Sequence, residues 1–221
     1  MRVEYRQRLD VLESGLQEQG SVCLRAVRAA VDALTTQDVE LCDEVIAFDD
    51  EIDARHHRIE KMVEEILALE TPVASDLRLV LAVLHNSIHL ERVGDQSVTI
   101  AKLTKLSAKF EPQHELVEGL REMGDRCEEM LTIALDSFAA RNVERARSLV
   151  ELDELIDRTN RRVMDKVLEM AATPGQQEWG MRMIIVSRCL ERVGDNAVDI
   201  GEQTVFLATG EFGGEFVEAS H

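Results

Sequence analysis

Apolar residues recur at intervals of three and four along nearly the whole chain, which is the spacing of amphipathic α-helices. Breaks in this pattern divide the chain into six long stretches. The expected helices span residues 5–36, 38–69, 73–108, 114–140, 142–171 and 176–208. Because long helices joined by short connections pack antiparallel, each set of three consecutive helices is predicted to form an up-down-up bundle.

Residues at the predicted breaks have the chemistry of helix starts. Asp38 and Asn142 stand at matching breaks, where a short polar side chain can accept hydrogen bonds from the first free backbone N–H groups. Thr71-Pro72 and Thr173-Pro174 each combine a residue type common at the N-cap with a proline suited to the first helical turn. These signals predict two halves of similar design.

An internal repeat supports this division. Residues 90–95 and 190–195 both read L-E-R-V-G-D, and F-D-D-E-I-D at 48–53 corresponds to L-D-E-L-I-D at 152–157. Repeats of this length indicate duplicated structural units. Glu111-Pro112 interrupts the helical period between them. The sequence therefore predicts an all-α fold of two tandem three-helix bundles related by internal duplication, covering residues 1–110 and 111–221.

Pairs of acidic residues four positions apart occur on the second and third helices of each half. They are Asp49 and Asp53, Glu91 and Asp95, Asp153 and Asp157, and Glu191 and Asp195. A single pair of this kind usually lies on a solvated helix face. With about 100° per residue, however, Leu84 and Val98 fall within about 20° of Glu91, so this pair interrupts the apolar stripe. Four carboxylates are therefore expected to converge in each half.

Converging carboxylates repel each other, by about 1 kcal/mol per pair at 4 Å in water and about 4 kcal/mol at an effective dielectric of 20. Protonation, salt bridges or multivalent cations can offset this repulsion. Arg92 and Arg192 lie about 100° around the helix from the acids and are poorly aimed to do so. Bound metal ions are therefore the favoured explanation. Oxygen ligands alone do not select among iron, zinc, manganese and magnesium.

Further polar residues lie near these pairs. His56 shares the face of the second-helix acids and can act as a direct ligand or support one, whereas its counterpart in the second half is Asn160. Asp199 would extend the acidic stripe of the second half. His85 and His89 lie about 120° and 160° around their helix from the acidic pair, so they are not expected to be ligands.

Composition excludes several classes of protein. The formal net charge of −18 argues against nucleic-acid binding, which requires clustered basic residues. No apolar run reaches the roughly 18 residues of a membrane span, and the first ten residues lack the apolar stretch of a signal peptide, so a cytoplasmic protein without direct membrane insertion is expected. The four cysteines have no C-x-x-C spacing and are expected to be small buried residues.

The duplicated E/D-x-x-x-D pairs, the two L-E-R-V-G-D motifs and L-A-T-G-E at 207–211 resemble the PhoU family over nearly the whole chain. The resemblance implies a homodimer that carries multinuclear iron or zinc clusters on the eight acids. It also implies a non-enzymatic negative regulator of the phosphate regulon and phosphate uptake. Its partners would be the ATPase subunit of the phosphate ABC transporter and a sensor histidine kinase. Family members often have histidine after E-R-V-G-D, where this chain has Gln96 and Asn196.

Two other classes of function stay open from the sequence. A carboxylate-bridged bundle metalloenzyme of the di-iron type would normally contain E-x-x-H motifs, and only Asp53-x-x-His56 approximates one within a helix. A metal-free helical scaffold would require the acids to be protonated or paired with basic residues. Metal analysis separates the scaffold from the other two classes, and oxygen-dependent turnover would identify the enzyme.

Overall fold

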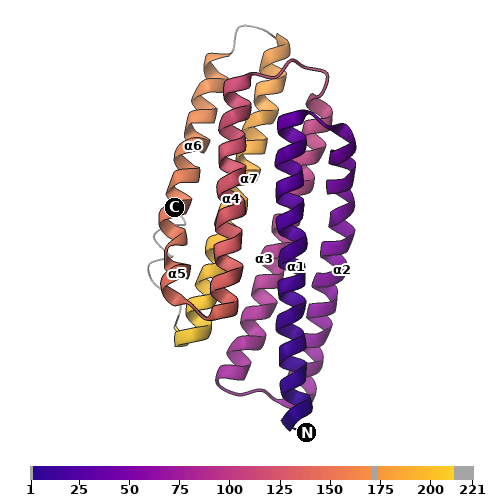
Figure 1. The fold of residues 1–221 in the computed structure, drawn as a ribbon, viewed down its shortest axis with the longest axis vertical. Coiled ribbons are helices and arrows are strands. Elements are labelled where there is room, and N and C mark those ends of the chain that lie inside the picture. Colours follow the sequence, from indigo (N-terminus) through magenta and orange to yellow (C-terminus); the bar gives the residue numbers. More distant parts are fainter. Residues whose placement is uncertain (1, 171–173, 212–221) are drawn as a thin grey trace.

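The computed structural model describes residues 2–170 and 174–211, and all regular structure within these ranges is helical. The helices are α1 (Arg2–Thr36), α2 (Val39–Glu70), α3 (Ser75–Ser107), α4 (His114–Ala140), α5 (Val143–Arg147), α6 (Leu149–Glu169) and α7 (Pro174–Thr209). Apart from the short α5, they are long rods that run roughly alongside one another (Figure 1). The predicted all-α fold is confirmed.

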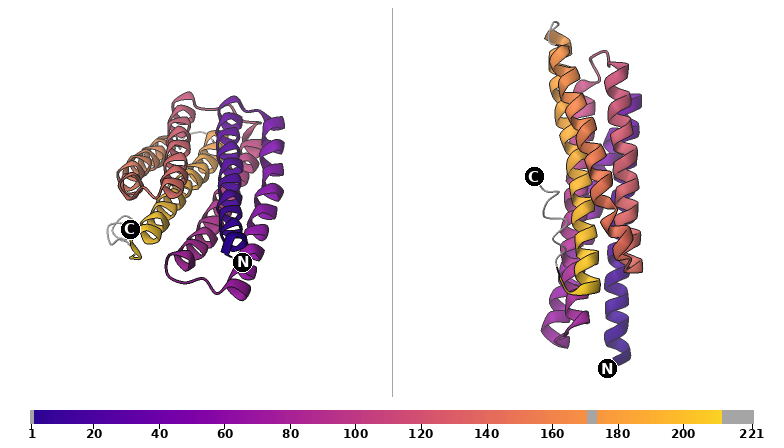
Figure 2. Two further views of the ribbon diagram at one scale, coloured as in Figure 1. Left: turned by 60° about the horizontal axis from the view of Figure 1, so that its bottom comes forward. Right: turned by 90° about the vertical axis from the view of Figure 1, so that its left-hand side faces the viewer.

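The helices form two bundles that lie side by side along their length (Figures 1 and 2). Helices α1, α2 and α3 pack together in one bundle, and α4, α6 and α7 pack together in the other, with α5 against α7. Residues 108–113 connect the bundles. The predicted pair of tandem three-helix bundles is thus confirmed, while the assignment of residues 1–110 and 111–221 as separate domains stays a prediction.

Two of the predicted helix starts are confirmed. The Asp38 carboxylate accepts hydrogen bonds from the backbone N–H groups of Glu40 and Leu41 at 2.9 and 3.0 Å. The Asn142 side-chain oxygen accepts one from the backbone N–H of Arg145 at 3.0 Å. Both interactions satisfy donors that have no partner within the first helical turn.

The predicted start at Thr71-Pro72 is wrong. Thr71 has a left-handed backbone (φ 46°, ψ 60°) and ends α2, whereas α3 begins three residues after Pro72, at Ser75. Proline disfavours the helical conformation of the preceding residue, so it stops α2 instead of starting α3. In the second half Pro174 is the first residue of α7, and Thr173 lies outside the described residues.

The predicted helix over residues 142–171 is divided at Ser148 into α5 and α6. The Ser148 hydroxyl donates a hydrogen bond to the Arg145 carbonyl at 2.8 Å, and its backbone N–H reaches the Glu144 carbonyl at 3.3 Å. A serine hydroxyl that bonds back to the preceding turn disturbs the regular helical ladder. The interruption is local, because Ser148 itself keeps right-handed helical angles.

Helices α1 and α4 meet through a reciprocal pair of contacts. A Cβ atom added to Gly20 would lie 2.7 Å from the Leu135 methyl groups, and one added to Gly124 would lie 2.4 Å from a Val31 methyl group. Gly20 and Gly124 are equivalent in the repeat, as are Val31 and Leu135. In each half, the side chain at the same repeat position therefore packs into the space left by a glycine of the other half.

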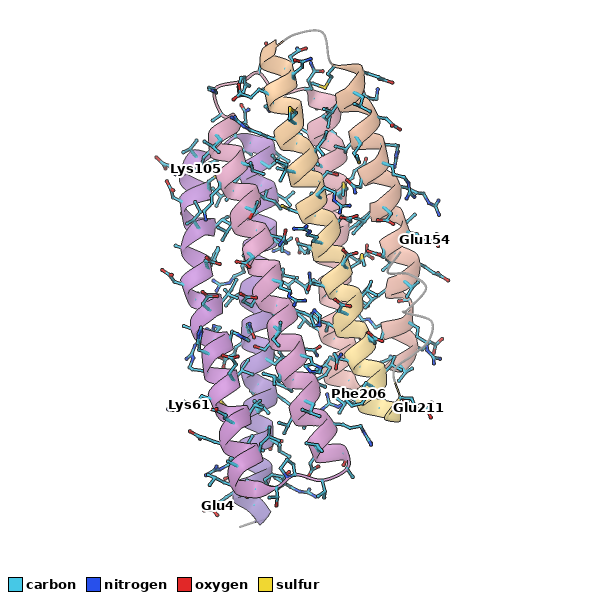
Figure 3. All side chains as sticks on the ribbon, turned by 180° about the vertical axis from the view of Figure 1, so that it is seen from behind. Glu4, Lys61, Lys105, Glu154, Phe206 and Glu211 are labelled. Carbon is cyan, nitrogen blue, oxygen red and sulfur yellow. The ribbon has the colours of Figure 1, made fainter. Side chains whose placement is uncertain are left out.

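Helices α3 and α7 form the second contact between the bundles, and Figure 3 shows them side by side. Their interface contains hydrogen bonds from His85 Nδ1 to Gln203 Oε1 at 3.3 Å and from His89 Nδ1 to Asn196 Oδ1 at 3.0 Å. These two histidines therefore face the neighbouring bundle. One continuous apolar core runs through both bundles and contains the four unpaired cysteines, whose predicted burial is confirmed.

Candidate carboxylate sites

Four of the predicted acids lie along the contact between α2 and α3, here named the first seam: Asp49, Asp53, Glu91 and Asp95. The helices come close because Gly94 has no side chain, and a Cβ there would lie 2.9 Å from the Ile52 side chain. Burial, followed by the charges of Asp53 and Asp95, raises the pKa of Asp49. Burial and the Asp95 charge raise the pKa of Glu91. Carboxylates from both helices therefore influence one another across the seam.

The other four acids lie along the contact between α6 and α7, here named the second seam: Asp153, Asp157, Glu191 and Asp195. The helix approach depends directly on a glycine, because a Cβ on Gly194 would lie 2.8 Å from Asp153 Oδ1 and 3.0 Å from the Ile156 side chain. Gly194 thus leaves the space that the Asp153 carboxylate occupies.

Two carboxylate oxygens of the second seam are buried without a hydrogen-bond partner, namely Asp153 Oδ1 and Glu191 Oε2. Asp153 as a whole is only 6% exposed. The other Glu191 oxygen, Oε1, pairs with Arg188 Nη1 at 2.5 Å. Burying a charged oxygen without a partner costs free energy of folding, so a proton or a cation at these two atoms would stabilise the folded state.

The pKa values of the second seam also show that burial and neighbouring carboxylates disfavour negative charge there. Burial, followed by the charges of Asp195, Asp157 and Glu191, raises the pKa of Asp153 to about 7. Burial, followed by the charges of Glu191 and Asp157, raises the pKa of Asp195 to about 6. The Asp195 residue is exposed to solvent, so water screens much of this effect, and the buried Asp153 is the better indicator of repulsion in this seam. The second seam therefore holds negative charge less readily than isolated carboxylates do.

Each half thus places its two predicted acidic pairs on one helix seam. Among residues 2–170 and 174–211, no three Asp, Glu, His or Cys side chains already have the arrangement of a metal site. Arg188, which the sequence analysis overlooked, neutralises part of the second seam. Its position three residues before Glu191 on the same helix face is the signal that would have found it.

The other candidate ligands have different surroundings. His56 lies in the first seam and bonds to Ser87 Oγ at 2.9 Å, and Asn160 occupies the same place in the second half, bonded to Ser187 at 2.7 Å. Asp199 faces His89 across the α3 and α7 contact, at 3.3 Å from its Nδ1. Asp199 is therefore shared between the acidic stripe and the interface of the two bundles.

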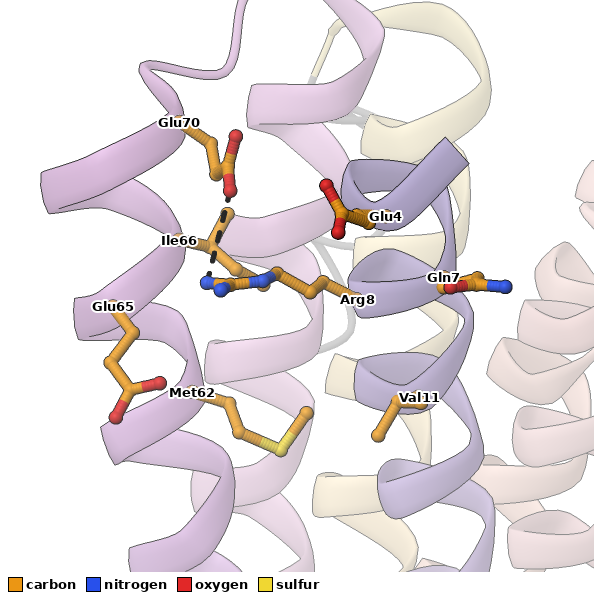
Figure 4. A pocket seen from close by; sticks show the side chains of 8 residues that line it. All are labelled: Glu4, Gln7, Arg8, Val11, Met62, Glu65, Ile66 and Glu70. Atoms are coloured by element: carbon orange, nitrogen blue, oxygen red, sulfur yellow. Dashed lines mark ion pairs between the residues drawn. The ribbon is translucent and has the colours of Figure 1, made fainter. Parts of the chain in front are cut away.

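A groove of about 560 Å³ lies between the first turns of α1 and the last turns of α2 (Figure 4). It is lined by Glu4, Gln7, Arg8, Val11, Met62, Glu65, Ile66 and Glu70. Arg8 and Glu70 form an ion pair across it at 3.8 Å. None of the eight predicted site residues lines this groove, so it is separate from both seams.

Within the described residues, no helix has the combination of length and apolar character needed to cross a membrane. This agrees with the absence of a long apolar run in the sequence.

Comparisons with known proteins match nearly the whole chain. The family described as PhoU domain matches twice, over residues 16–104 and 120–204. A relative from Clostridium acetobutylicum, named phosphate-specific transport system accessory protein PhoU homolog, is 30% identical over 92% of this chain and 93% of its own length. A relative of the same name from Pseudomonas aeruginosa is 31% identical over 94% of this chain and 86% of its own length.

Solved structures show the same architecture. The crystal structure of PhoU from Pseudomonas aeruginosa superposes with a TM-score of 0.89 at 29% identity, covering 94% of this chain and all of that one. The phosphate transport system regulatory protein PhoU from Streptococcus pneumoniae gives a TM-score of 0.86 at 28% identity, covering 95% and 99% of the two chains. The two family matches coincide with the two bundles and include all eight acids of the seams.

Proposed function

Because this chain belongs to the PhoU family, we propose that it is an accessory protein that regulates phosphate transport. The observation that carries the proposal is the match of both repeats to one family, together with structural similarity over at least 94% of the chain. Relatives matched over most of their own length carry names that refer to the phosphate-specific transport system. The proposal therefore concerns the whole chain and not one of its halves.

We further propose that the regulation is negative and works by binding to other proteins. Its partners would be the ATPase subunit of the phosphate ABC transporter and a sensor histidine kinase, with the chain acting as a homodimer. Two features of the described residues are compatible with this role. The helical surface is long and strongly acidic, and the sequence contains no Gly-rich phosphate loop or nucleophile motif.

Metal clusters at the two seams form the third part of the proposal. The donor set fits, because each seam supplies four carboxylates, and Asp153 Oδ1 and Glu191 Oε2 have no other partner. Binding would require rotation of the side chains, which are not yet arranged around a common point. All eight acids would be ligands, with iron or zinc as the first candidates and manganese or magnesium as alternatives. Bound cations would offset the repulsion that raises the pKa of Asp153 and Asp195.

The regulatory role is tested by deleting the gene and measuring phosphate-regulated expression under phosphate-replete conditions. Loss of negative regulation should raise expression, and the intact gene supplied on a plasmid should restore repression. Normal repression in the deletion strain, with no second gene of the family present, would contradict the regulatory role.

A metal-free scaffold is the second candidate, and the raised pKa of Asp153 favours it, since a shared proton can replace a cation. Element analysis of protein purified without chelator or a metal-affinity tag separates the two candidates. More than one transition-metal ion per chain supports metal clusters, because one divalent ion cannot balance eight carboxylates. Protein without bound metal supports the scaffold.

A further inference from the structure

A buried polar network lies behind the first seam, formed by Gln19 of α1, His56 of α2 and Ser87 of α3. His56 Nδ1 lies 2.9 Å from Ser87 Oγ, and Ser87 Oγ lies 2.7 Å from Gln19 Oε1. Gln19 Nε2 donates to the Ser87 backbone carbonyl at 3.0 Å. Gln19 and Ser87 are fully buried, so no solvent competes for these bonds. Gln19 and Ser87 belong to none of the motifs identified in the sequence.

The network fixes the direction of each hydrogen bond. The Ser87 carbonyl can only accept, so the Gln19 amide must point its nitrogen at it and its oxygen at the Ser87 hydroxyl. The amide oxygen in turn can only accept, which uses the single hydroxyl hydrogen of Ser87. His56 Nδ1 must therefore carry the hydrogen in its bond to Ser87 Oγ.

A neutral imidazole with hydrogen on Nδ1 has a free lone pair on Nε2. His56 lies near the Glu91 carboxylate of the first seam, whose pKa the ring would lower if it were protonated. Its Nε2 lies 3.5 Å from Glu60 Oε1, and the side chain is 14% exposed. The ring is thus held by buried groups on its Nδ1 side, while Nε2 faces the Glu60 carboxylate, which a cation bound at Nε2 would also contact.

We propose that His56 is a nitrogen ligand of the first seam through Nε2, and that Gln19 and Ser87 are positioning residues that fix its tautomer. The proposal rests on the metal-binding part of the proposed function. Hydrogen bonding to the second nitrogen of a ligating histidine is a common means of fixing ring orientation and tautomer. The class of ligand is a borderline transition-metal ion such as zinc or iron(II), which imidazole binds well.

The second half supplies a natural comparison. At the repeat positions it has Met123 for Gln19, Asn160 for His56 and Ser187 for Ser87. The Ser187 hydroxyl donates to Asn160 Oδ1 at 2.7 Å and lies 3.4 Å from Met123 Sδ. This arrangement keeps the serine but offers no imidazole nitrogen. The first seam should therefore prefer zinc over manganese, whereas the all-oxygen second seam should discriminate less between them.

Zinc titration tests the ligand. The second seam is first disabled by Asp157→Ala with Glu191→Ala, in untagged protein freed of metal. In this background His56→Asn, which installs the residue of the second half, should weaken zinc binding roughly 10–100-fold and change manganese binding much less. His57→Asn is the matched control, because it removes an exposed imidazole whose Nδ1 donates to the Asp53 backbone carbonyl at 2.8 Å and whose ring meets His56 edge-on. It should leave zinc affinity unchanged.

The tautomer is tested without metal, by the ¹⁵N chemical shifts of the His56 ring. The native protein should show hydrogen on Nδ1 and none on Nε2. Gln19→Met, which installs the residue of the second half, frees the Ser87 hydroxyl to donate to Nδ1 and should move the hydrogen to Nε2. The same substitution should weaken zinc binding roughly 10-fold, although His56 is still present.

Each outcome decides the inference. Zinc binding that survives His56→Asn at full strength overturns it and leaves the carboxylate clusters intact. An Nε2-protonated native ring, or a tautomer unaffected by Gln19→Met, overturns the role of Gln19 and Ser87. If the native protein binds no zinc, iron or manganese, metal binding and this inference fall together, while the gene-deletion test of regulation stands.

Discussion

At the scale of single residues, Asp153 is an acidic side chain whose surroundings disfavour its negative charge. Its carboxyl is buried between α6 and α7, in space that is open only because Gly194 has no side chain, and Oδ1 has no hydrogen-bond partner. Burial and neighbouring acids raise its pKa from 3.8 to about 7. In the unfolded chain this carboxyl ionises near pH 4, so the metal-free folded state bears a penalty that appears between these two pH values.

Asp153→Asn should therefore stabilise the metal-free protein in a pH-dependent way. The folded state binds more protons than the unfolded state between about pH 4 and 7, so the native aspartate costs stability as pH rises through this window. At pH 8 the variant should gain a few kcal/mol in free energy of unfolding, with about 4 kcal/mol as the upper limit. The gain should disappear toward pH 4. Denaturant melts at several pH values measure it.

Glu154→Gln serves as the control for this prediction, because Glu154 is an exposed residue on the outer side of the same helix (Figure 3). Its melts should follow those of the native protein at every pH. An Asp153→Asn variant with native stability at pH 8 would show that the buried carboxyl ionises without cost, and the argument for a required cation at this atom would fail.

At the scale of helices, the contact between α1 and α4 combines glycine gaps with an ion pair between Arg28 and Glu128 at the surface. Gly124→Ala would place a Cβ 2.4 Å from Val31 Cγ2 and 3.1 Å from Val31 Cβ. Valine has little rotational freedom in a helix, so the clash must separate the helices. The variant should lose about 1–2 kcal/mol in free energy of unfolding, even though alanine favours helix formation.

Gly119→Ala makes the same substitution on the same helix in a place with room, since the nearest atom would be Val163 Cγ2 at 4.0 Å. This variant should gain about 0.5–1 kcal/mol. Adding Val31→Ala to Gly124→Ala should recover part of the loss, which a double-mutant cycle measures. Equal effects at positions 119 and 124 would show that the gap at Gly124 is unimportant for packing.

At the scale of the whole molecule, a formal charge of −18 is combined with two acidic seams that border one continuous apolar core. If cations bind these seams only in the folded state, their removal must lower stability by mass action. At a free metal concentration about 100 times the dissociation constant, the loss is about 2.7 kcal/mol. Chelation should then lower the unfolding temperature by roughly 5–10 °C for a chain of this size.

Calorimetry before and after verified metal removal measures this change, and restored zinc should reverse it. A variant with neutral residues at the eight acids should not respond to the chelator, which controls for non-specific effects. An unchanged melt of the native protein after metal removal would falsify the coupling between metal binding and stability.

The sequence by itself determined the elements and their duplication. Helical period, the capping groups of Asp38 and Asn142 and the repeated L-E-R-V-G-D motif depend on residues within a few positions of each other, where spacing alone fixes geometry. The placement of the eight acids on the seams follows from the same spacing. Prediction from local sequence failed at Thr71. This residue type is common at helix starts, but here it ends α2 in a left-handed conformation.

Only the tertiary structure decided which side chains meet across helices. Gln19 and Ser87 are 68 positions apart, and nothing in their spacing indicates that a buried amide orients the His56 ring. The gaps at Gly20 and Gly124, and the lack of partners for Asp153 Oδ1 and Glu191 Oε2, likewise depend on how closely the helices approach. The distance between two helices is set by the packing of all the side chains between them, because protein interiors are close-packed. No local sequence pattern encodes that distance.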